Sequence, residues 1–213
     1  MTEQEDGIMK EGNDKKRTVR LTKRQMQAME TKNKIYQAAV REINKKGFNN
    51  VNIEDITTAA NVAKGSFYTH FDSKEDIIFY TFETSDKIYQ RAIEKVEGSS
   101  FLYMVTHFVQ LCYTEHEKRG KGIIKAMISN YYNYPGEAFY SHDRVLYKCL
   151  EHIVETGKKQ QVLDASLPTD HYANILLSTM VGVEVMWCFD DQGQSLADMM
   201  MEAIRITALG MMK

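Results

Sequence analysis

The chain has 213 residues, with 27 lysines and arginines against 29 aspartates and glutamates, for a net charge of −2. This length suits one compact unit or two small ones with a sizeable core. The three cysteines, at positions 112, 149 and 188, are too few and too scattered for a disulfide framework or a closed zinc site. We expect buried free thiols, no metal and no cofactor. No apolar stretch has transmembrane length and the chain begins without the apolar region of a signal peptide, so we expect a cytoplasmic protein.

The first 30 residues are predicted to form a basic, flexible arm. Its cations are Lys15, Lys16, Arg17, Arg20, Lys23 and Arg24, whereas acidic residues dominate the last third of the chain. Local cations, and not the net charge, decide the affinity for a phosphate backbone, so this asymmetry would orient the protein on DNA. The arm either follows phosphates or a minor groove, or is a solvated tail that makes no contact.

The next segment, residues 31–73, has the pattern of a helix-turn-helix unit. Residues 32–46 show helical periodicity and stop at Gly47, a residue typical of a helix C-terminus. A short helix follows, predicted to begin with a capping box between Asn52 and Asp55. Asn61 stands where the chain must reverse, and asparagine tolerates the left-handed conformation of a tight turn.

A second short helix is predicted over residues 63–70. Ala63, Phe67 and Phe71 are spaced four apart and form its inner stripe. The opposite side carries small or hydrogen-bonding residues, which suit a helix lying in the major groove. Two short helices that merely pack inside an all-α domain are the alternative. A capping box between Ser73 and Asp76 would place Lys74 in the first turn of the next helix, where only a nearby phosphate favours a cation.

The motif from Gly65, GSFYTHF-x-SKE, resembles the DNA-binding domain of the tetracycline-repressor (TetR) family, and the resemblance extends over residues 35–77. It implies an all-α protein: an N-terminal three-helix helix-turn-helix domain and, over residues 74–213, a helical domain for effector binding and dimerisation. The candidate DNA-binding residues are Asn52, Lys64, Gly65, Ser66, Tyr68, Thr69, His70 and Lys74. Of these, the resemblance implies that Lys64 and Ser66 approach bases or backbone and that Tyr68 and Lys74 hold phosphates. Two positions depart from the family pattern: Asn61 replaces a turn glycine, and Thr57 replaces a small apolar residue.

Residues 74–213 are predicted to form six helical blocks without an internal repeat. The blocks are 75–96, 101–118, 123–134, 141–160, 169–189 and 195–209. The fifth is apolar on nearly all sides, and a helix of this kind must be covered on several faces. We expect the last two blocks to form half of a four-helix homodimer interface, with Gly182 allowing their close approach. Burial within one subunit is the alternative.

Aromatic and methionine side chains crowd the middle of the chain and could line an effector cavity with a few polar anchors. The candidates are Tyr103, His107, Met127, Tyr131, Tyr134, Met180, Glu184 and Trp187. Each residue taken singly is more often plain core. Glu184 is the most informative candidate, since a carboxylate in an apolar helix needs a protein or ligand partner. The hypothesis is an aromatic or cationic amphipathic effector.

The resemblance therefore implies a transcriptional repressor that binds a (pseudo)palindromic operator as a dimer and is released by a small molecule. A ligand-responsive activator of the same fold is the alternative. An enzyme would need a nucleophile–base pair, a carboxylate pair or a metal cluster at usable spacing, and the sequence shows none. An architectural DNA-binding protein would be more uniformly basic and would not need an acidic, aromatic-rich body.

Overall fold

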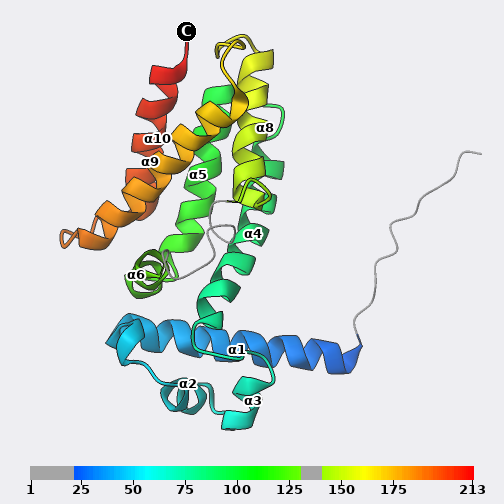
Figure 1. Ribbon diagram of the computed structural model, residues 1–213, viewed down its shortest axis with the longest axis vertical. Helices are drawn as coiled ribbons and strands as arrows, with labels where there is room; N and C mark the ends of the chain where they lie inside the picture. Colours follow the sequence, from blue (N-terminus) through cyan, green and yellow to red (C-terminus); the bar gives the residue numbers. More distant parts are fainter. Residues whose placement is uncertain (1–21, 131–140) are drawn as a thin grey trace, which may run out of the picture.

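The computed structural model describes residues 22–130 and 141–213, and both ranges are helical with no strand (Figure 1). In chain order the elements are α1 (Lys23–Lys46), the 3-10 helix η1 (Phe48–Asn50), α2 (Ile53–Ala60), α3 (Lys64–Tyr68), α4 (Asp76–Val96), α5 (Phe101–Glu117), α6 (Lys121–Ser129), α8 (Val145–Lys159), α9 (Thr169–Phe189) and α10 (Leu196–Met211). The predicted all-α class is confirmed. Five of the six predicted body blocks end within a few residues of their helices, whereas α6 stops at Ser129, before the expected end at 134.

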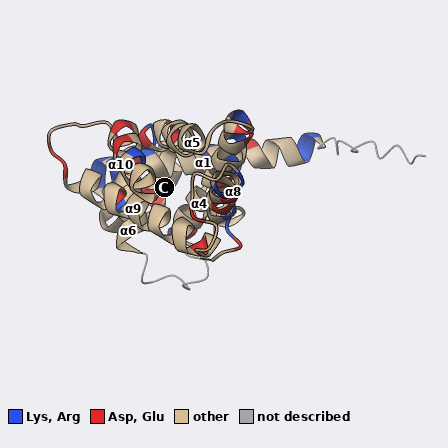
Figure 2. Ribbon diagram, turned by 90° about the horizontal axis from the view of Figure 1, so that it is seen from above, with Lys and Arg blue, Asp and Glu red and all other residues tan. Residues whose placement is uncertain are grey.

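Helix α1 begins earlier than expected. Thr22 forms a capping box with Gln25: Thr22 Oγ1 accepts from the Gln25 backbone N–H, and the Thr22 backbone N–H donates to Gln25 Oε1. The helix therefore starts at Lys23. Residues 23–30 of the expected flexible arm are therefore helical, and Figure 2 shows this end of α1 projecting beyond the body. Residues 1–21 lie outside the described ranges, so the contact of the arm with DNA stays a prediction.

The helix-turn-helix lies below α1 (Figure 1), and its local signals are as predicted. Asn52 Oδ1 accepts from the Asp55 N–H at 2.8 Å, and Asp55 Oδ2 accepts from the Asn52 N–H at 3.1 Å. Asn61 adopts the left-handed conformation, with φ 49° and ψ 56°. Thr57 is buried and donates its hydroxyl to the Glu54 carbonyl, so its polar group is satisfied within α2.

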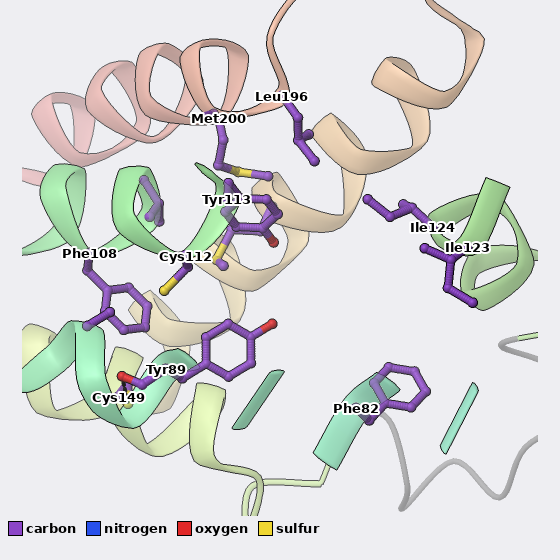
Figure 3. Packing of buried hydrophobic residues seen from close by; sticks show 14 of the residues in the cluster. Phe82, Tyr89, Phe108, Cys112, Tyr113, Ile123, Ile124, Cys149, Leu196 and Met200 are labelled. Carbon is purple, nitrogen blue, oxygen red and sulfur yellow. Dashed lines mark hydrogen bonds between the residues drawn. The ribbon is translucent and has the colours of Figure 1, made fainter. Parts of the chain in front are cut away.

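The body rises from α1 along α4, with α5 and α8 packed beside it; α10 packs against α5, and α9 crosses between α8 and α10 (Figure 1). One hydrophobic core runs from α1 to α10. Figure 3 shows side chains of α4, α5 and α10 meeting in it, among them Tyr89, Tyr113 and Met200. All three cysteines are buried free thiols, as predicted.

The turn between α5 and α6 fastens α1 to the body. Asn44 of α1 donates from Nδ2 to the Arg119 carbonyl at 2.6 Å, and its Oδ1 accepts from the Gly122 N–H at 2.7 Å. Arg119 donates from its guanidinium to the hydroxyls of Ser85 and Thr84 on α4, at 2.7 and 3.1 Å. The turn between α5 and α6 is thus hydrogen-bonded to both the end of α1 and the middle of α4, and it fixes their positions relative to each other.

Candidate DNA-binding surface and effector cavity

The inner side of α3 is fixed by one aromatic side chain. Phe67 is fully buried, and its ring lies 5.6 Å from that of Phe71. It packs in the same core as Ile56 and Ala60 of α2. The direction of the outer side of α3 therefore follows from the packing of Phe67.

The outer side of α3 is open to solvent. Lys64, Gly65, Tyr68 and Thr69 are exposed, and Ser66 and His70 are half-buried. A Cβ added at Gly65 would meet no atom within 4 Å, so a surface can approach the backbone closely there. The helix itself is shorter than the expected 63–70, because Ala63 is its N-cap and it ends at Tyr68, with Thr69 as C-cap.

Lys64 forms an ion pair with Glu54 of α2 across this surface. The hydrogen bond from Lys64 lowers the pKa of the Glu54 carboxyl, and the same bond raises the pKa of Lys64. Both side chains are more than half exposed, so water and salt screen the pair. In the free protein, Lys64, which was predicted to approach DNA, is therefore paired with the carboxylate of Glu54.

We predict that Glu54→Gln raises operator affinity by up to about five-fold at low salt, because the change frees Lys64 and removes a negative charge facing the phosphates. Fluorescence anisotropy with labelled operator over a range of salt concentrations measures the effect. Glu94→Gln, an exposed change on α4 away from this surface, is the matched control. An equal gain from both variants would show that only net charge had changed.

Lys74 does not lie where the sequence predicted. Helix α4 begins at Asp76, so Lys74 belongs to the preceding turn and not to a first helical turn. The Asp76 carboxylate accepts from the Ser73 hydroxyl and from the Ser73 backbone N–H. The Ser73 hydroxyl oxygen accepts no hydrogen bond from a backbone N–H of α4, so the expected capping box is incomplete. Lys74 Nζ donates to the carbonyls of Phe48 and Val51, at 2.8 and 2.9 Å. These internal bonds explain a lysine here without a phosphate.

The two remaining predicted contact residues carry no charge at this surface. The side-chain oxygen of Asn52 is occupied by the capping box, while its amide N–H2 group has no hydrogen-bond partner among the described residues. Burial, and secondarily the nearby Lys32, lowers the pKa of His70 below its usual value. His70 is therefore neutral at pH 7 and offers hydrogen bonds in place of a cation.

A cavity lies inside the body between α4, α5, α8 and α9. Its volume is about 50 Å³, far below the few hundred Å³ of a typical pocket for a drug-sized ligand. Its described lining is mostly apolar and aromatic and consists of Phe82, Tyr89, Tyr113, His116, Met127, Ser141, Arg144, Leu146, Tyr147, Leu177, Met180, Val181 and Glu184. An effector of ordinary size would have to displace some of these side chains.

Polar groups stand at several points of this apolar wall. The Tyr113 hydroxyl donates to the Glu184 carboxylate at 3.0 Å, and Arg144 pairs with Asp86 of α4 at 2.8 Å. Burial, aided by the charge of Arg119, lowers the pKa of His116 to about 3, so this histidine is neutral at pH 7. Its buried Nε2 has no hydrogen-bond partner within the described part of the chain. The cavity therefore combines a carboxylate and an open imidazole nitrogen with aromatic rings.

The structure brings together three of the predicted effector residues, Met127, Met180 and Glu184. Tyr103 and His107 stack on one another, with ring centroids 3.7 Å apart, on a side of α5 that does not line the cavity. The structure therefore does not bring them together with Glu184, and their role in effector binding stays a prediction. Trp187 is likewise outside the lining, since it donates from Nε1 to the Gln194 carbonyl at 2.8 Å and packs under Lys121. Tyr131 and Tyr134 lie outside the described residues.

Sequence reasoning missed several lining residues, chiefly Phe82, Tyr89, His116 and Arg144. Phe82 and Tyr89 are seven apart, with Ser85 between them, and so share one buried face of α4. That spacing was available in the sequence. His116 and Arg144 carried no local signal. No group of three or more histidine, cysteine or acidic side chains is placed to hold a metal ion in residues 22–130 and 141–213.

Comparison with known proteins identifies the family. Residues 35–81 match the family model of bacterial regulatory proteins of the tetR family. The chain is a transcriptional regulator with a TetR-family DNA-binding domain. It is 24% identical to the HTH-type transcriptional regulator AcrR of Shigella flexneri over 192 residues, 82% of this chain and 86% of that protein. It is 23% identical to the HTH-type transcriptional regulator YwcC of Bacillus subtilis over 159 residues, 65% of this chain and 67% of that protein.

Solved structures share the fold of this TetR-family chain over most of its length. The transcriptional regulator FadR of Bacillus subtilis, solved in complex with stearoyl-CoA, superposes with a TM-score of 0.70 at 19% identity, covering 83% of this chain and 97% of that one. The TetR-family assignment confirms the DNA-binding regulator prediction and the two-part helical architecture. The homologues are transcription regulators and not enzymes.

Proposed function

We propose that this TetR-family protein is a repressor that binds a (pseudo)palindromic operator as a homodimer and is released by a small molecule. The observation that carries the proposal is the arrangement of α3. Its polar side is exposed, while its buried side is tied through α2 and α1 to a body that contains a cavity. DNA contact is assigned to the exposed residues of α3, with Lys64 and Tyr68 as the principal ones. A regulator that acts on chromosomal DNA works in the cytoplasm.

The dimer surface is assigned to α9 and α10. Their outer sides expose large apolar side chains, which are Ile175, Met186, Phe189, Ile206 and Leu209. Contrary to the expectation from the sequence, helix α9 is long and apolar enough to cross a membrane by length and composition. Only 33% of its apolar 18-residue stretch is buried within the subunit. A second copy would cover the remainder. Gly182 has no neighbour within 4 Å of an added Cβ, so it does not serve close approach to α10 within one chain, and its open side faces outward.

We predict that Ile206→Glu weakens the dimer on the order of 100-fold, because a carboxylate would be buried without a partner. Ile206 is 61% exposed in the single chain, so its own fold tolerates the change. Light scattering or sedimentation over a concentration series reports the mass. Leu167→Glu, which adds the same charge at a residue 42% exposed in the α8–α9 loop, is the control. A wild-type monomer at micromolar concentration would contradict the dimer.

The effector is proposed to be an aromatic or cationic amphipathic molecule. Tyrosine rings and the Glu184 carboxylate suit a cation, and apolar side chains suit its hydrophobic part. Met127 and Met180 have unbranched, adaptable side chains, which allows the small cavity to open. Opening it would displace Phe82 and Tyr89 on α4, the helix that follows the DNA-binding unit directly. A changed direction of α4 alters the spacing of two recognition helices, and operator binding depends on both docking together.

We predict that Glu184→Gln raises the concentration of benzyltrimethylammonium needed for operator release by about ten-fold, because the variant lacks the charge that faces the cation. Anisotropy of labelled operator, titrated with this probe, measures release. Glu94→Gln, an exposed change on α4 that does not line the cavity, is the control. Unchanged release by the Glu184 variant would remove the carboxylate from effector recognition.

The experiment that tests the function is selection of bound DNA from a random pool, followed by release with a panel of small molecules. A repressor of this kind should enrich a sequence with two half-sites whose centres are about one helical turn, 34–36 Å, apart. At least one aromatic or cationic compound should then release it. Enrichment of no sequence would contradict the function, and enrichment without release would contradict the effector.

A further inference from the structure

A second hollow lies outside the body, in the corner where α4 rises from α1. It is a groove of about 670 Å³, walled by α1, by α4 and by the end of α5. Its described lining includes no residue of α2 or α3, so it is separate from the DNA-binding surface. It shares no lining residue with the cavity in the body either. The groove therefore lies at the joint between the DNA-binding unit and the body.

Basic side chains dominate this groove. Glu115 is the only acidic residue in the described lining, whereas six described lining residues are basic: Arg41, Lys87, Arg91, Lys95, Lys118 and Arg119. Lys87, Arg91 and Lys95 follow at four-residue intervals along one side of α4, where like charges repel. A concave surface of one sign in a chain of net charge −2 attracts anions.

Most of these cations are not neutralised by the protein. The carboxylate of Glu115 pairs with Lys118 at 2.6 Å. Arg119 donates to hydroxyls and a carbonyl of α4, not to a carboxylate. Among the described residues, Arg41, Lys87, Arg91 and Lys95 form no ion pair. Four cations from two helices thus line one groove without a carboxylate partner among the described residues.

A buried hydroxyl gives a second indication of a ligand. Tyr36 lines the groove and is only 4% exposed, yet its hydroxyl has no hydrogen-bond partner in the described ranges. The neighbouring Tyr80, whose ring centroid is 5.1 Å away, donates to Asn33 and so does not satisfy it. A buried hydroxyl normally finds a partner. Val40, Ile88 and Leu111 add an apolar wall beside it.

We propose that this groove binds a phosphorylated organic molecule, with its phosphates against the cations of α1 and α4 and its organic part against the tyrosine and the apolar wall. Phosphate oxygens accept charge-assisted hydrogen bonds from arginine and lysine. Because Arg41 belongs to α1 and Arg91 to α4, one ligand would tie the DNA-binding unit to the body. This site is additional to the effector cavity and does not depend on it.

Calorimetric titration of the full chain at constant ionic strength tests the site, with inorganic tripolyphosphate and ATP as the probes. We expect one ATP per protomer, bound more tightly than tripolyphosphate because of the apolar wall. Arg91→Ala combined with Lys95→Ala should weaken both probes by at least about ten-fold. Lys148→Ala combined with Lys159→Ala removes the same charge from exposed positions on α8 and should leave binding within about two-fold. Tyr36→Phe should weaken ATP without changing the charge.

Four results would overturn the proposal. Absence of binding by either probe would remove the anion site. Equal binding by the α4 and α8 double variants would assign the anion to cations elsewhere, such as the basic N-terminal segment. If tripolyphosphate bound as tightly as ATP, the apolar wall would contribute nothing to binding, and the proposed recognition of an organic group would be contradicted. If the α4 variant instead bound operator DNA with a smaller salt dependence while still binding both probes, the groove would be a DNA-backbone surface and not a ligand site.

Discussion

Phe67→Ala is expected to lower the free energy of unfolding by about 3–5 kcal/mol and to abolish operator binding, because it empties the core of the helix-turn-helix. The ring is fully buried and packs against the rings of Phe71 and Tyr68, the latter in a T-shaped arrangement. Helix α3 has only five residues, too few for stability of its own, so its direction depends on this packing. Chemical denaturation followed by circular dichroism measures the loss of stability.

The adjacent residue supplies the matched variant. Tyr68 is 48% exposed on the outer side of α3. Tyr68→Ala should change the free energy of unfolding by less than about 1 kcal/mol, as expected for a surface substitution. The same change should weaken operator binding by about 1–3 kcal/mol, the range of one good contact at a base edge or phosphate. Undiminished operator binding by a folded Tyr68→Ala protein would remove α3 from the DNA interface.

The helix-turn-helix could be predicted because its signals are local. The capping box joins Asn52 to Asp55, three residues away, and Asn61 meets the requirement of the turn by its own backbone conformation. Lys74 shows where this reasoning ends. Its partners, the carbonyls of Phe48 and Val51, lie 26 and 23 residues away. Nothing in the neighbouring sequence indicates them, so a phosphate was the nearest available explanation.

The sequence predicted the types of residue that line the cavity but not most of their positions, because composition does not say which side of a helix faces inward. The buried stripe of α5 includes Val109, Cys112, Tyr113 and His116. Tyr103 and His107 are four apart and lie off that stripe, together with Gln110 and Thr114. The helical spacing in the sequence already places Tyr103 and His107 on a different side of α5 from Tyr113. The pairing of Arg144 with Asp86, 58 residues away, was not available.

The other large expected effect concerns the joint between α1 and α6. Gly122 lies in the first turn of α6, and a Cβ built on it would be 2.6 Å from Asn44 Cα and 2.9 Å from the Ile43 carbonyl oxygen. Both are backbone atoms of α1, so no side-chain rotation relieves the overlap. Gly122→Ala must push α1 away from the body, and we expect a loss of about 1–3 kcal/mol in the free energy of unfolding. Operator affinity should fall as well, since α1 carries the DNA-binding unit.

Two further variants distinguish the steric overlap caused by Gly122→Ala from two other effects, the loss of hydrogen bonds at this joint and the change in helix propensity. Gly210→Ala in α10, where an added Cβ meets nothing within 4 Å in its own subunit, should stabilise that subunit's helix by up to about 1 kcal/mol. Asn44→Ala removes the bonds to Arg119 and Gly122 without adding bulk, and should cost about 1 kcal/mol. If the coupling runs through this joint, Asn44→Ala should weaken release by effector more than it weakens operator binding. Gly122→Ala as stable as the wild type would show that α1 and α6 move freely past one another, and effector coupling would then depend on α4 alone.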